Sequence, residues 1–240
     1  YDENGVEKDD TNNGWFIVKA ADEIWYYETD GVWQNNPSDI AQAALVGQKP
    51  GDPKVVNNYT EDDKILSDGT RVPVYNDKDK TFLGPQTPPI YWNMRNDFEW
   101  KDFTFAFSLY SYMGHKSLSG NWLNQDNGGS QVTNCFNMPD KKYWTPDNPT
   151  NDYCRLDAKG PNTGLAGGVS KLYNRSFLRL DNISVGYTLP REMTRKFMVD
   201  RIHLTFSCNN VFTISGWEYG DPETGGFATR TFNFGVNVTL

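Results

Sequence analysis

The last ten residues of the chain, "TFNFGVNVTL" at positions 231–240, alternate strictly between apolar and polar side chains. A period of two is typical of a β-strand whose two faces meet different surroundings. In a soluble sandwich the apolar face lies against a protein core. In an outer-membrane barrel it faces lipid, and the polar face lines a wet lumen. The apolar side carries Phe232, Phe234, Val236, Val238 and Leu240.

Four more segments alternate in the same way and predict companion strands. They cover residues 90–100, 103–110, 182–189 and 202–209, and a less regular strand region runs from 15 to 33. Helical periodicity is convincing nowhere, although residues 191–197 fit one short helical turn after Pro190. The pattern predicts an all-β, antiparallel fold of about six strands. Further apolar positions on these strands are Phe103, Phe105, Phe107, Ile183 and Val185.

The connections between these segments alternate between short and long. Only a tight turn separates Phe98 from Phe103, and a short link joins Leu189 to Ile202. In contrast, residues 35–89 and 114–175 are long stretches rich in Gly, Asn, Pro and Asp. Structureless loops of that length are rare in compact soluble domains, whereas short turns on one side and long loops on the other are typical of outer-membrane barrels. The lengths therefore favour lipid over a protein core.

Composition narrows the classes further. The 240 residues carry a net charge of -8, which argues against a nucleic-acid partner because that would require a basic face. Nothing approaches 18 consecutive apolar residues, so a transmembrane helix is excluded, but a membrane strand needs only about 9–11 alternating residues. The polar side of the strands is rich in Asn, Ser, Thr and Gly with few charges, which suits a lumen. Aromatic residues near strand ends fit an interfacial girdle, although they are also ordinary strand formers.

Several motifs resemble one known family. "SFLRLDNISVGYTLP" (176–190), "NNVFTIS" (209–215) and the closing strand resemble the C-terminal barrel strands of SusC/RagA-type TonB-dependent outer-membrane transporters. "YYETDGVWQ" (26–34), "KPGD" (49–52) and "YWTPDNPTND" (143–152) resemble further elements of that family, in the same order. The sequence departs from the family in residues 57–80, where acidic side chains lack the spacing of a calcium loop, and at Leu240, where an aromatic is usual.

The resemblance implies a barrel of about 22 strands in the Gram-negative outer membrane, filled by an N-terminal plug that contacts TonB. We expect residues 1–240 to be the C-terminal sector of such a barrel, with the plug and the remaining strands outside this chain. Long extracellular loops and short periplasmic turns follow from the same resemblance. It also implies import of oligosaccharides or peptides and a SusD-like surface lipoprotein that caps the barrel.

Candidate contacts with substrate or lipoprotein lie in the second long loop. They are Trp122, Phe136, Tyr143 and Trp144. We expect Trp144 to be structural, because the "WTPDNP" turn is rigid, and Trp122 to be the better ligand candidate. The lipid-facing set is Phe103, Phe105, Phe107, Ile183, Val185, Phe232, Phe234, Val236 and Val238.

The three cysteines permit one bridge, and we expect it between Cys135 and Cys154 in the second long loop, with Cys208 a free thiol on the apolar side. No catalytic motif, phosphate loop or metal-ligand spacing is present, so we expect neither an enzyme nor a cofactor. His203 is interpreted as a hydrogen-bonded structural residue. The alternative functions are a secreted β-sandwich glycan-binding module and, less favoured, a β-rich hydrolase.

Overall fold

A computed structural model of the protein describes residues 3–119, 142–166, 168–218 and 220–240. The chain divides into two compact units. Unit 1 comprises Tyr1–Gln86 and Ser117–Tyr173, and unit 2 comprises Thr87–Lys116 and Asn174–Leu240. Within the described residues, no helix is both long and apolar enough to cross a membrane.

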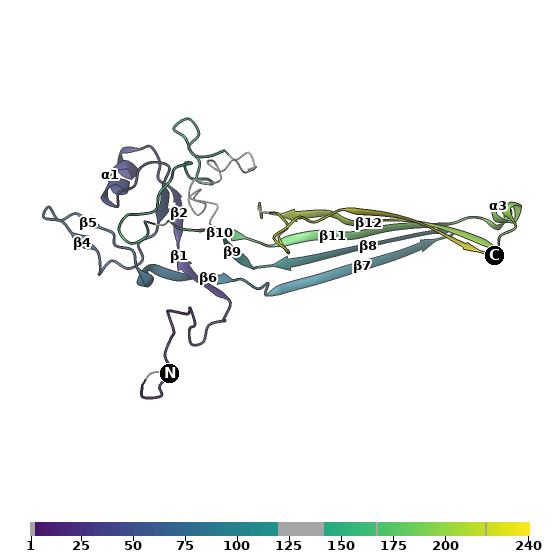
Figure 1. Ribbon diagram of the computed structural model, residues 1–240, viewed down its shortest axis with the longest axis horizontal. Coiled ribbons are helices and arrows are strands. Elements are labelled where there is room, and N and C mark those ends of the chain that lie inside the picture. The colour runs from purple at the N-terminus through teal and green to yellow at the C-terminus, as the bar shows by residue number, and fades with distance from the viewer. Residues whose placement is uncertain (1–2, 120–141, 167, 219) are drawn as a thin grey trace. The chain divides into compact units, whose positions relative to one another are not determined.

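Unit 2 is built on one five-stranded antiparallel sheet in the order β13-β12-β11-β8-β7. Its strands lie side by side in Figure 1, with α3 and the C-terminus at the same end of the sheet. The expected short helical turn is present as α3 and the 3-10 helix η3. The bounds are β7 Ile90–Trp100, β8 Phe103–Met113, β11 Phe177–Thr188, α3 Arg191–Thr194, η3 Arg195–Phe197, β12 Arg201–Ser215 and β13 Thr231–Thr239.

The register of the sheet gathers the predicted apolar positions on one face, called the apolar face here. Phe105, Val185, Phe206 and Phe234 form one continuous row across four strands. Phe107, Ile183, Cys208 and Phe232 form the next row. The opposite side, called the polar face, carries mainly Thr, Ser, Asn and Gly, together with larger side chains such as Tyr110, Arg179 and His203. The alternation read from the sequence is therefore confirmed as a two-faced sheet.

Glycine on the polar face leaves room for side chains of the neighbouring strands to lie over it. A Cβ at Gly186 would lie 2.3 Å from Thr104 Oγ1 and 2.9 Å from His203 Cε1. The ring Nδ1 of His203 lies 2.9 Å from the hydroxyl of Thr188, which confirms the hydrogen-bonded role expected for this histidine.

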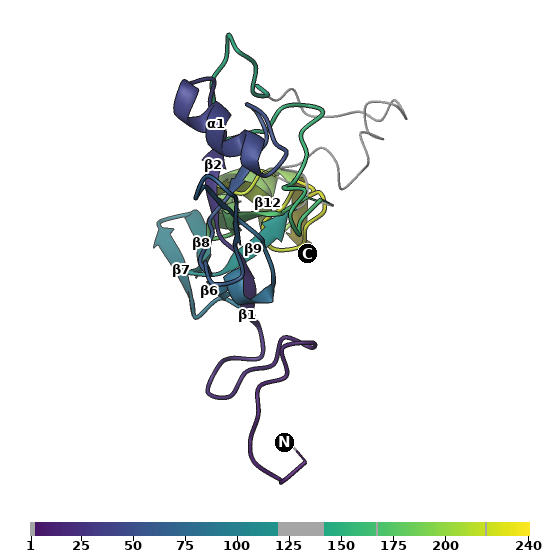
Figure 2. The ribbon, with the colours of Figure 1, turned by 90° about the vertical axis from the view of Figure 1, so that its left-hand side faces the viewer.

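Unit 1 contains short strands, one helix and a core. Figures 1 and 2 both show α1 beside β2. Strand β1 pairs with β6, β2 with β3, β4 with β5 and β9 with β10. The bounds are β1 Glu23–Tyr27, β2 Thr29–Val32, α1 Pro37–Leu45, β3 Pro53–Val55, β4 Lys64–Ile65, β5 Arg71–Val72, the 3-10 helix η1 Asp77–Asp79, β6 Lys80–Pro85, β9 Lys116–Ser119 and β10 Lys171–Asn174.

Helix α1 corrects the expectation that residues 35–89 hold no helix. Asn36 caps its first turn, because the Asn36 side chain accepts a hydrogen bond from the backbone N–H of Asp39 at 2.9 Å. Pro37 stands at the first helical position, where its missing N–H costs nothing. The helix has only nine residues, which is too short to show a clear helical periodicity, so its start is indicated by Asn36 and Pro37 instead.

The strand region expected over residues 15–33 is also corrected. Regular strands begin only at Glu23, and Trp15 makes an isolated bridge to Asp10. Moreover, β1 pairs with β6 of the same chain, so this segment does not depend on strands from elsewhere for its partner.

The long connections share a hydrophobic core, which the sequence analysis did not predict. Val55, Tyr75, Trp144 and Val169 come from distant parts of the chain and are each 5% exposed or less. Burial of these side chains offsets part of the backbone entropy lost when the connections are ordered.

Candidate functional site

The polar face of the sheet carries a buried arginine in the middle of a strand. Arg179 of β11 is 4% exposed. Its Nε donates to Thr213 Oγ1 at 3.0 Å, and its Nη1 donates to Glu223 Oε2 at 3.0 Å and to the Tyr110 hydroxyl at 3.1 Å. Nη2 donates to Asp221 Oδ2. Because a guanidinium stays charged, its burial requires these acceptors. We call these five residues the Arg179 cluster.

The acids of this cluster come from the connection between β12 and β13, the 216–230 loop. Tyr110 donates its hydroxyl proton to Glu223 at 2.7 Å, while Arg175 Nε donates to the backbone oxygen of Pro222 at 2.6 Å. Tyr110 of β8, Arg179 of β11 and Arg175, which directly precedes β11, thus hold the loop. The loop folds back onto the polar face at the end where β8 finishes and β11 begins.

Asp221 also organises the turn of this loop. Its Oδ1 accepts hydrogen bonds from the backbone N–H groups of Thr224 at 2.9 Å and Glu223 at 3.0 Å. Burial alone would raise the pKa of Asp221, but these N–H donors and the Arg179 guanidinium outweigh burial and lower the pKa below its ordinary value. The carboxylate is therefore charged at neutral pH.

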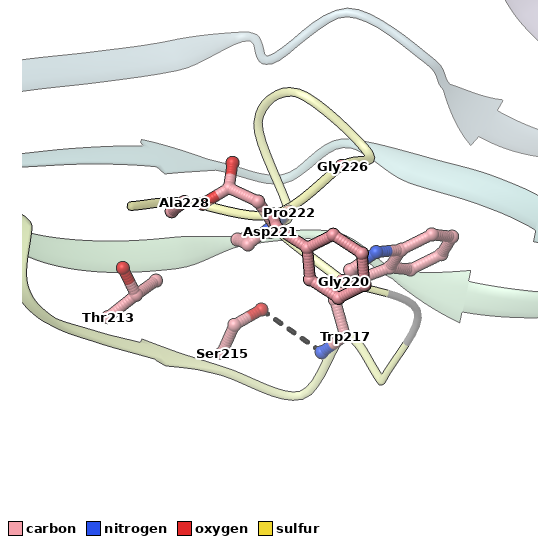
Figure 3. A pocket seen from close by; sticks show the side chains of 9 residues that line it. Thr213, Ser215, Trp217, Gly220, Asp221, Pro222, Gly226 and Ala228 are labelled. Atoms are coloured by element: carbon pink, nitrogen blue, oxygen red, sulfur yellow. Dashed lines mark hydrogen bonds between the residues drawn. The ribbon is translucent and has the colours of Figure 1, made fainter. Parts of the chain in front are cut away.

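A hollow of about 250 Å³ lies between this loop and the end of β12 (Figure 3). Ser215 Oγ accepts a hydrogen bond from the backbone N–H of Trp217 at 3.0 Å, which sets the start of the loop. The Arg175 guanidinium lies 5.2 Å from the centre of the Trp217 ring. We call this the Trp217 hollow, and it is lined by Thr213, Ser215, Trp217, Gly220, Asp221, Pro222, Gly226, Phe227 and Ala228.

A second hollow, of about 490 Å³, follows the polar face toward the β7 edge. Tyr91 is 74% exposed there, and its ring centre lies 6.3 Å from that of Tyr112. Arg95 and Asp97 form an ion pair at 2.9 Å on the same face. The polar face therefore offers phenol, amide, hydroxyl and charged groups to whatever passes along it.

The apolar face differs sharply, because large side chains stand open on it. The fractional exposure is 39% for Phe105, 46% for Phe206, 64% for Phe232 and 70% for Phe234. Within the part of unit 2 that the structure describes, no second sheet covers this face. A contiguous apolar surface of this kind marks contact with a membrane or another protein.

The residues predicted as substrate or lipoprotein contacts do not form one site in the described structure. Trp122 and Phe136 lie outside the described residues. Trp144 is 4% exposed, and its Nε1 donates to Gln34 Oε1 at 3.0 Å. Tyr143 is half-buried, with its ring centre 6.3 Å from that of Tyr153. The structural role expected for Trp144 agrees with its burial.

Three of the motifs that carried the family resemblance, "YYETDGVWQ", "KPGD" and "YWTPDNPTND", meet in unit 1. A Cβ at Gly51 of "KPGD" would lie 2.6 Å from Trp144 Cε3, and the φ of +92° at Gly51 also requires glycine. Asp52 is 1% exposed and accepts a hydrogen bond from Arg155 Nη2 at 2.7 Å. Asn151 accepts one from the backbone N–H of Val32 at 3.1 Å. These motifs build the core of unit 1.

The expected disulfide is corrected by the structure. Cys154 is a free thiol, 1% exposed within the core of unit 1. Burial, together with the nearby Asp52 carboxylate, raises the pKa of this thiol far above its ordinary value. Cys135 lies outside the described residues. Cys208 is free and buried in its row on the apolar face, as expected.

The Arg179 cluster and Trp217 were missed by the sequence analysis. Arg179 lies inside a quoted motif, yet its partners are 69 and 42 residues away in sequence at Tyr110 and Asp221. The available signal was a single arginine among Ser, Thr and Asn on the polar side of a strand, together with two acids in a glycine-rich loop. A buried arginine requires carboxylate partners, but the sequence alone does not show which Asp or Glu residues these are.

Comparison with known proteins supports the family resemblance. No family model matches the chain. TonB-dependent receptor P3 of Formosa agariphila is 23% identical over 206 residues, covering 85% of this chain and 19% of the receptor. TonB-dependent receptor P39 of the same organism is 23% identical over 152 residues, covering 61% of this chain and 14% of the receptor.

Solved structures of a peptide importer share the fold. The RagAB peptide importer in its open-open state aligns with 91% of this chain and 22% of its own chain, at a TM-score of 0.57 and 18% identity. The RagAB peptide transporter aligns with 90% of this chain and 22% of its own chain, at a TM-score of 0.56 and 19% identity. The chain thus spans about a fifth of the length of the relatives it matches. The resemblance to SusC/RagA-type TonB-dependent transporters is confirmed.

Proposed function

We propose that this chain is the C-terminal sector of an outer-membrane β-barrel that imports oligosaccharides or peptides in a TonB-dependent manner. The sheet supplies consecutive strands of the barrel wall, and strands outside this chain complete a barrel of about 22 strands around a plug. The protein is a transporter and not an enzyme. Its substrates pass through the lumen that the polar face lines.

The observation that carries this proposal is the open apolar face. Five strands of roughly membrane-spanning length present Phe, Val, Ile and Trp on one side and polar groups on the other. Water would disfavour this surface at about 25 cal/mol for each Å² of apolar area. Lipid removes that cost, and the polar face then meets a wet lumen.

The connection lengths give the orientation. The tight β7–β8 turn and the α3 link lie at one end of the sheet, which we assign to the periplasm. The longer connections, among them residues 114–175 and the 216–230 loop, leave from the other end, which we assign to the cell exterior. This matches the usual asymmetry of outer-membrane barrels.

The partners follow from the family. RagAB, the solved relative, is described as a peptide importer or transporter. We assign to this chain a SusD-like surface lipoprotein that covers the outer mouth, and TonB, which acts through the plug. The secreted β-sandwich alternative requires a second sheet against the apolar face, and unit 2 has a single five-stranded sheet in its described part.

The proposal is tested by mapping which residues contact lipid in the full-length transporter. Nitroxide labels are placed at Val236 and at its neighbour Asn237, which point to opposite faces. We expect label 236 to be relaxed mainly by oxygen, which concentrates in lipid, and label 237 mainly by a water-soluble nickel complex. Equal accessibility at the two positions would overturn the barrel assignment.

The partner assignment has a separate test. Native mass spectrometry of the complex extracted from its own membrane is expected to show a second, lipidated subunit. A transporter that is extracted intact and always alone would contradict the lipoprotein partner.

A further inference from the structure

We propose that the Trp217 hollow is a substrate subsite that binds one pyranose ring of a neutral oligosaccharide. This inference rests on the proposed function, because it places the hollow at the outer mouth of the lumen. It goes further by assigning a site and a substrate class to residues that neither the motifs nor the relatives single out.

The position of the hollow is the first argument. Thr213 and Ser215 lie on the polar face, opposite Arg179 and Phe177 of β11. The 216–230 loop that completes the hollow belongs to the end of the sheet from which the longer connections leave. Any molecule that enters the lumen along this wall therefore passes the hollow.

Two aromatic side chains in the lining are the second argument. Phe227 is 99% exposed, which is unusual for a phenylalanine and leaves its ring open to solvent. Trp217 has the Arg175 guanidinium 5.2 Å from its ring centre, and this cation holds the indole in place. The C–H groups of a pyranose carry partial positive charge and are attracted to the negative face of such rings.

The charge state of the lining is the third argument. Among the described lining residues, Asp221 is the one with an ionisable side chain, and it is bound to Arg179 and to two backbone N–H groups. Arg175, which borders Trp217, donates to the backbone oxygen of Pro222. The described lining therefore has no unpaired charge for a peptide terminus or an acidic sugar.

Hydroxyl chemistry supplies the polar part of the subsite. Thr213 Oγ1 accepts a hydrogen bond from Arg179 Nε, which leaves the hydroxyl proton of Thr213 able to donate to a ligand. The glycine positions Gly220 and Gly226 bring the backbone to the surface of the hollow. Its volume of about 250 Å³ suits one ring and is below the usual size of a site that encloses a whole drug-sized ligand.

The Arg179 cluster fixes one side of this site. Because Asp221 and Glu223 are bound to Arg179 of β11, the turn that they form needs less ordering when a ligand binds. Preorganisation of this kind raises affinity by lowering the ordering cost of binding.

The test measures binding to the purified full-length transporter with its co-purifying subunits. The probes are a mixture of neutral linear oligosaccharides of about four to eight hexose units and a mixture of uncharged peptides of the same lengths. We expect Trp217→Ala and Phe227→Ala each to weaken oligosaccharide binding by about tenfold or more. Trp217→Phe keeps an aromatic face and should retain most of the affinity.

Trp15→Ala is the matched control, since Trp15 is an exposed aromatic of unit 1 at 64% exposure. Protease resistance of the 216–230 loop shows whether each variant keeps its folded loop. Unchanged oligosaccharide affinity in both alanine variants would overturn the subsite. Loss of peptide binding in place of oligosaccharide binding would overturn the sugar assignment, as would a wild type that binds neither probe. The spin-label test at Val236 and Asn237 is independent, so either proposal can fail while the other stands.

Discussion

Unit 1 and the five-stranded sheet of unit 2 place their apolar side chains in opposite ways. In unit 1, Val32, Val46, Val55 and Trp144 are 5% exposed or less and meet in one core. On the sheet, residues of the same chemical types stand open on the apolar face, as Val236 does at 53%. One chain thus contains a unit with a closed apolar core and a sheet whose apolar side chains stand open, which fits the lipid contact that we propose for the sheet.

The two units also differ in where they bury charged side chains. In the described part of unit 1, the buried Asp52 carboxylate is paired with the half-buried Arg155 guanidinium beside the core. In the described part of unit 2, the most buried charges are Arg179, on the polar face of the sheet, and Asp221, in the 216–230 loop, and they pair with each other. The sheet therefore buries this ion pair by folding its own loop onto the polar face, the side that we propose lines the lumen.

The largest expected effect is the loss of stability when the core of unit 1 is disrupted. Trp144→Ala removes a buried indole and its hydrogen bond to Gln34, and we expect it to destabilise unit 1 by about 3–5 kcal/mol. Native-state hydrogen exchange on peptides of unit 1 in the full-length protein measures this change. The exposed Trp15→Ala variant should change it by less than about 0.5 kcal/mol. Equal effects would mean that Trp144 is not part of a closed core.

The second effect tests the apolar face. Val236→Arg places a charge where we assign lipid and should cost about 2–4 kcal/mol if the position lies near the bilayer midplane. Asn237→Arg is the matched control, because its side chain lies on the polar face beside His203. Urea unfolding of the transporter in phospholipid vesicles measures both. If Asn237→Arg proves the more costly, the assignment of the two faces is reversed.

The third effect is a pH dependence of the rate at which a protease cleaves the 216–230 loop. The folded pKa of Asp221 is lowered, so its contribution to holding the loop is present above the ordinary carboxyl pKa of about 3.9 and is lost as pH falls through the folded value. The charged groups that face Asp221 or its turn are Arg179, Arg175 and Glu223, and the two arginines stay charged across this range. We expect protease cleavage within the loop to accelerate from pH 7 to pH 3, using an acid-stable protease.

Asp221→Asn is the control for this titration. It cannot ionise, so its loop should already be accessible at pH 7 and the acceleration on acidification should shrink. A wild-type loop that is cleaved at one rate across this range would show that the Arg179 cluster does not hold it.

The sheet was predictable from the sequence because the signal is local. A strand shows its two faces through neighbouring residues, so "TFNFGVNVTL" alone was enough to assign Phe232 and Asn233 to opposite sides. The core of unit 1 was not predictable in this way. Val55, Tyr75 and Trp144 lie in irregular segments without periodicity, and only long-range packing makes them a core.

The candidate site was predictable only in part for the same reason. Aromatic residues in the long loops were a reasonable source of contacts, but burial removed Trp144 from that group. Trp217 was overlooked because the loop that carries it is short and glycine-rich. Its importance depends on Arg175, just before β11, and Arg179, within β11, which fix the loop to the polar face.

The smallest expected effect is on thiol reactivity, and it separates the two units without altering stability. In a Cys135→Ser background, Cys154 should react with a water-soluble maleimide only when unit 1 unfolds, because it is 1% exposed and burial raises its pKa away from the reactive thiolate. Cys208 lies between Ile183 and Phe232 on the apolar face, so we expect it to react with a lipid-soluble maleimide faster than with a charged one. Single Cys154→Ala and Cys208→Ala variants assign each label by peptide mass.

In the unmutated protein without reductant, both Cys135 and Cys154 should take up label after denaturation, since Cys154 is free. Protection of that pair until a reductant is added would restore the disulfide and contradict the free thiol, while rapid labelling of Cys208 by the charged reagent would place its strand against water.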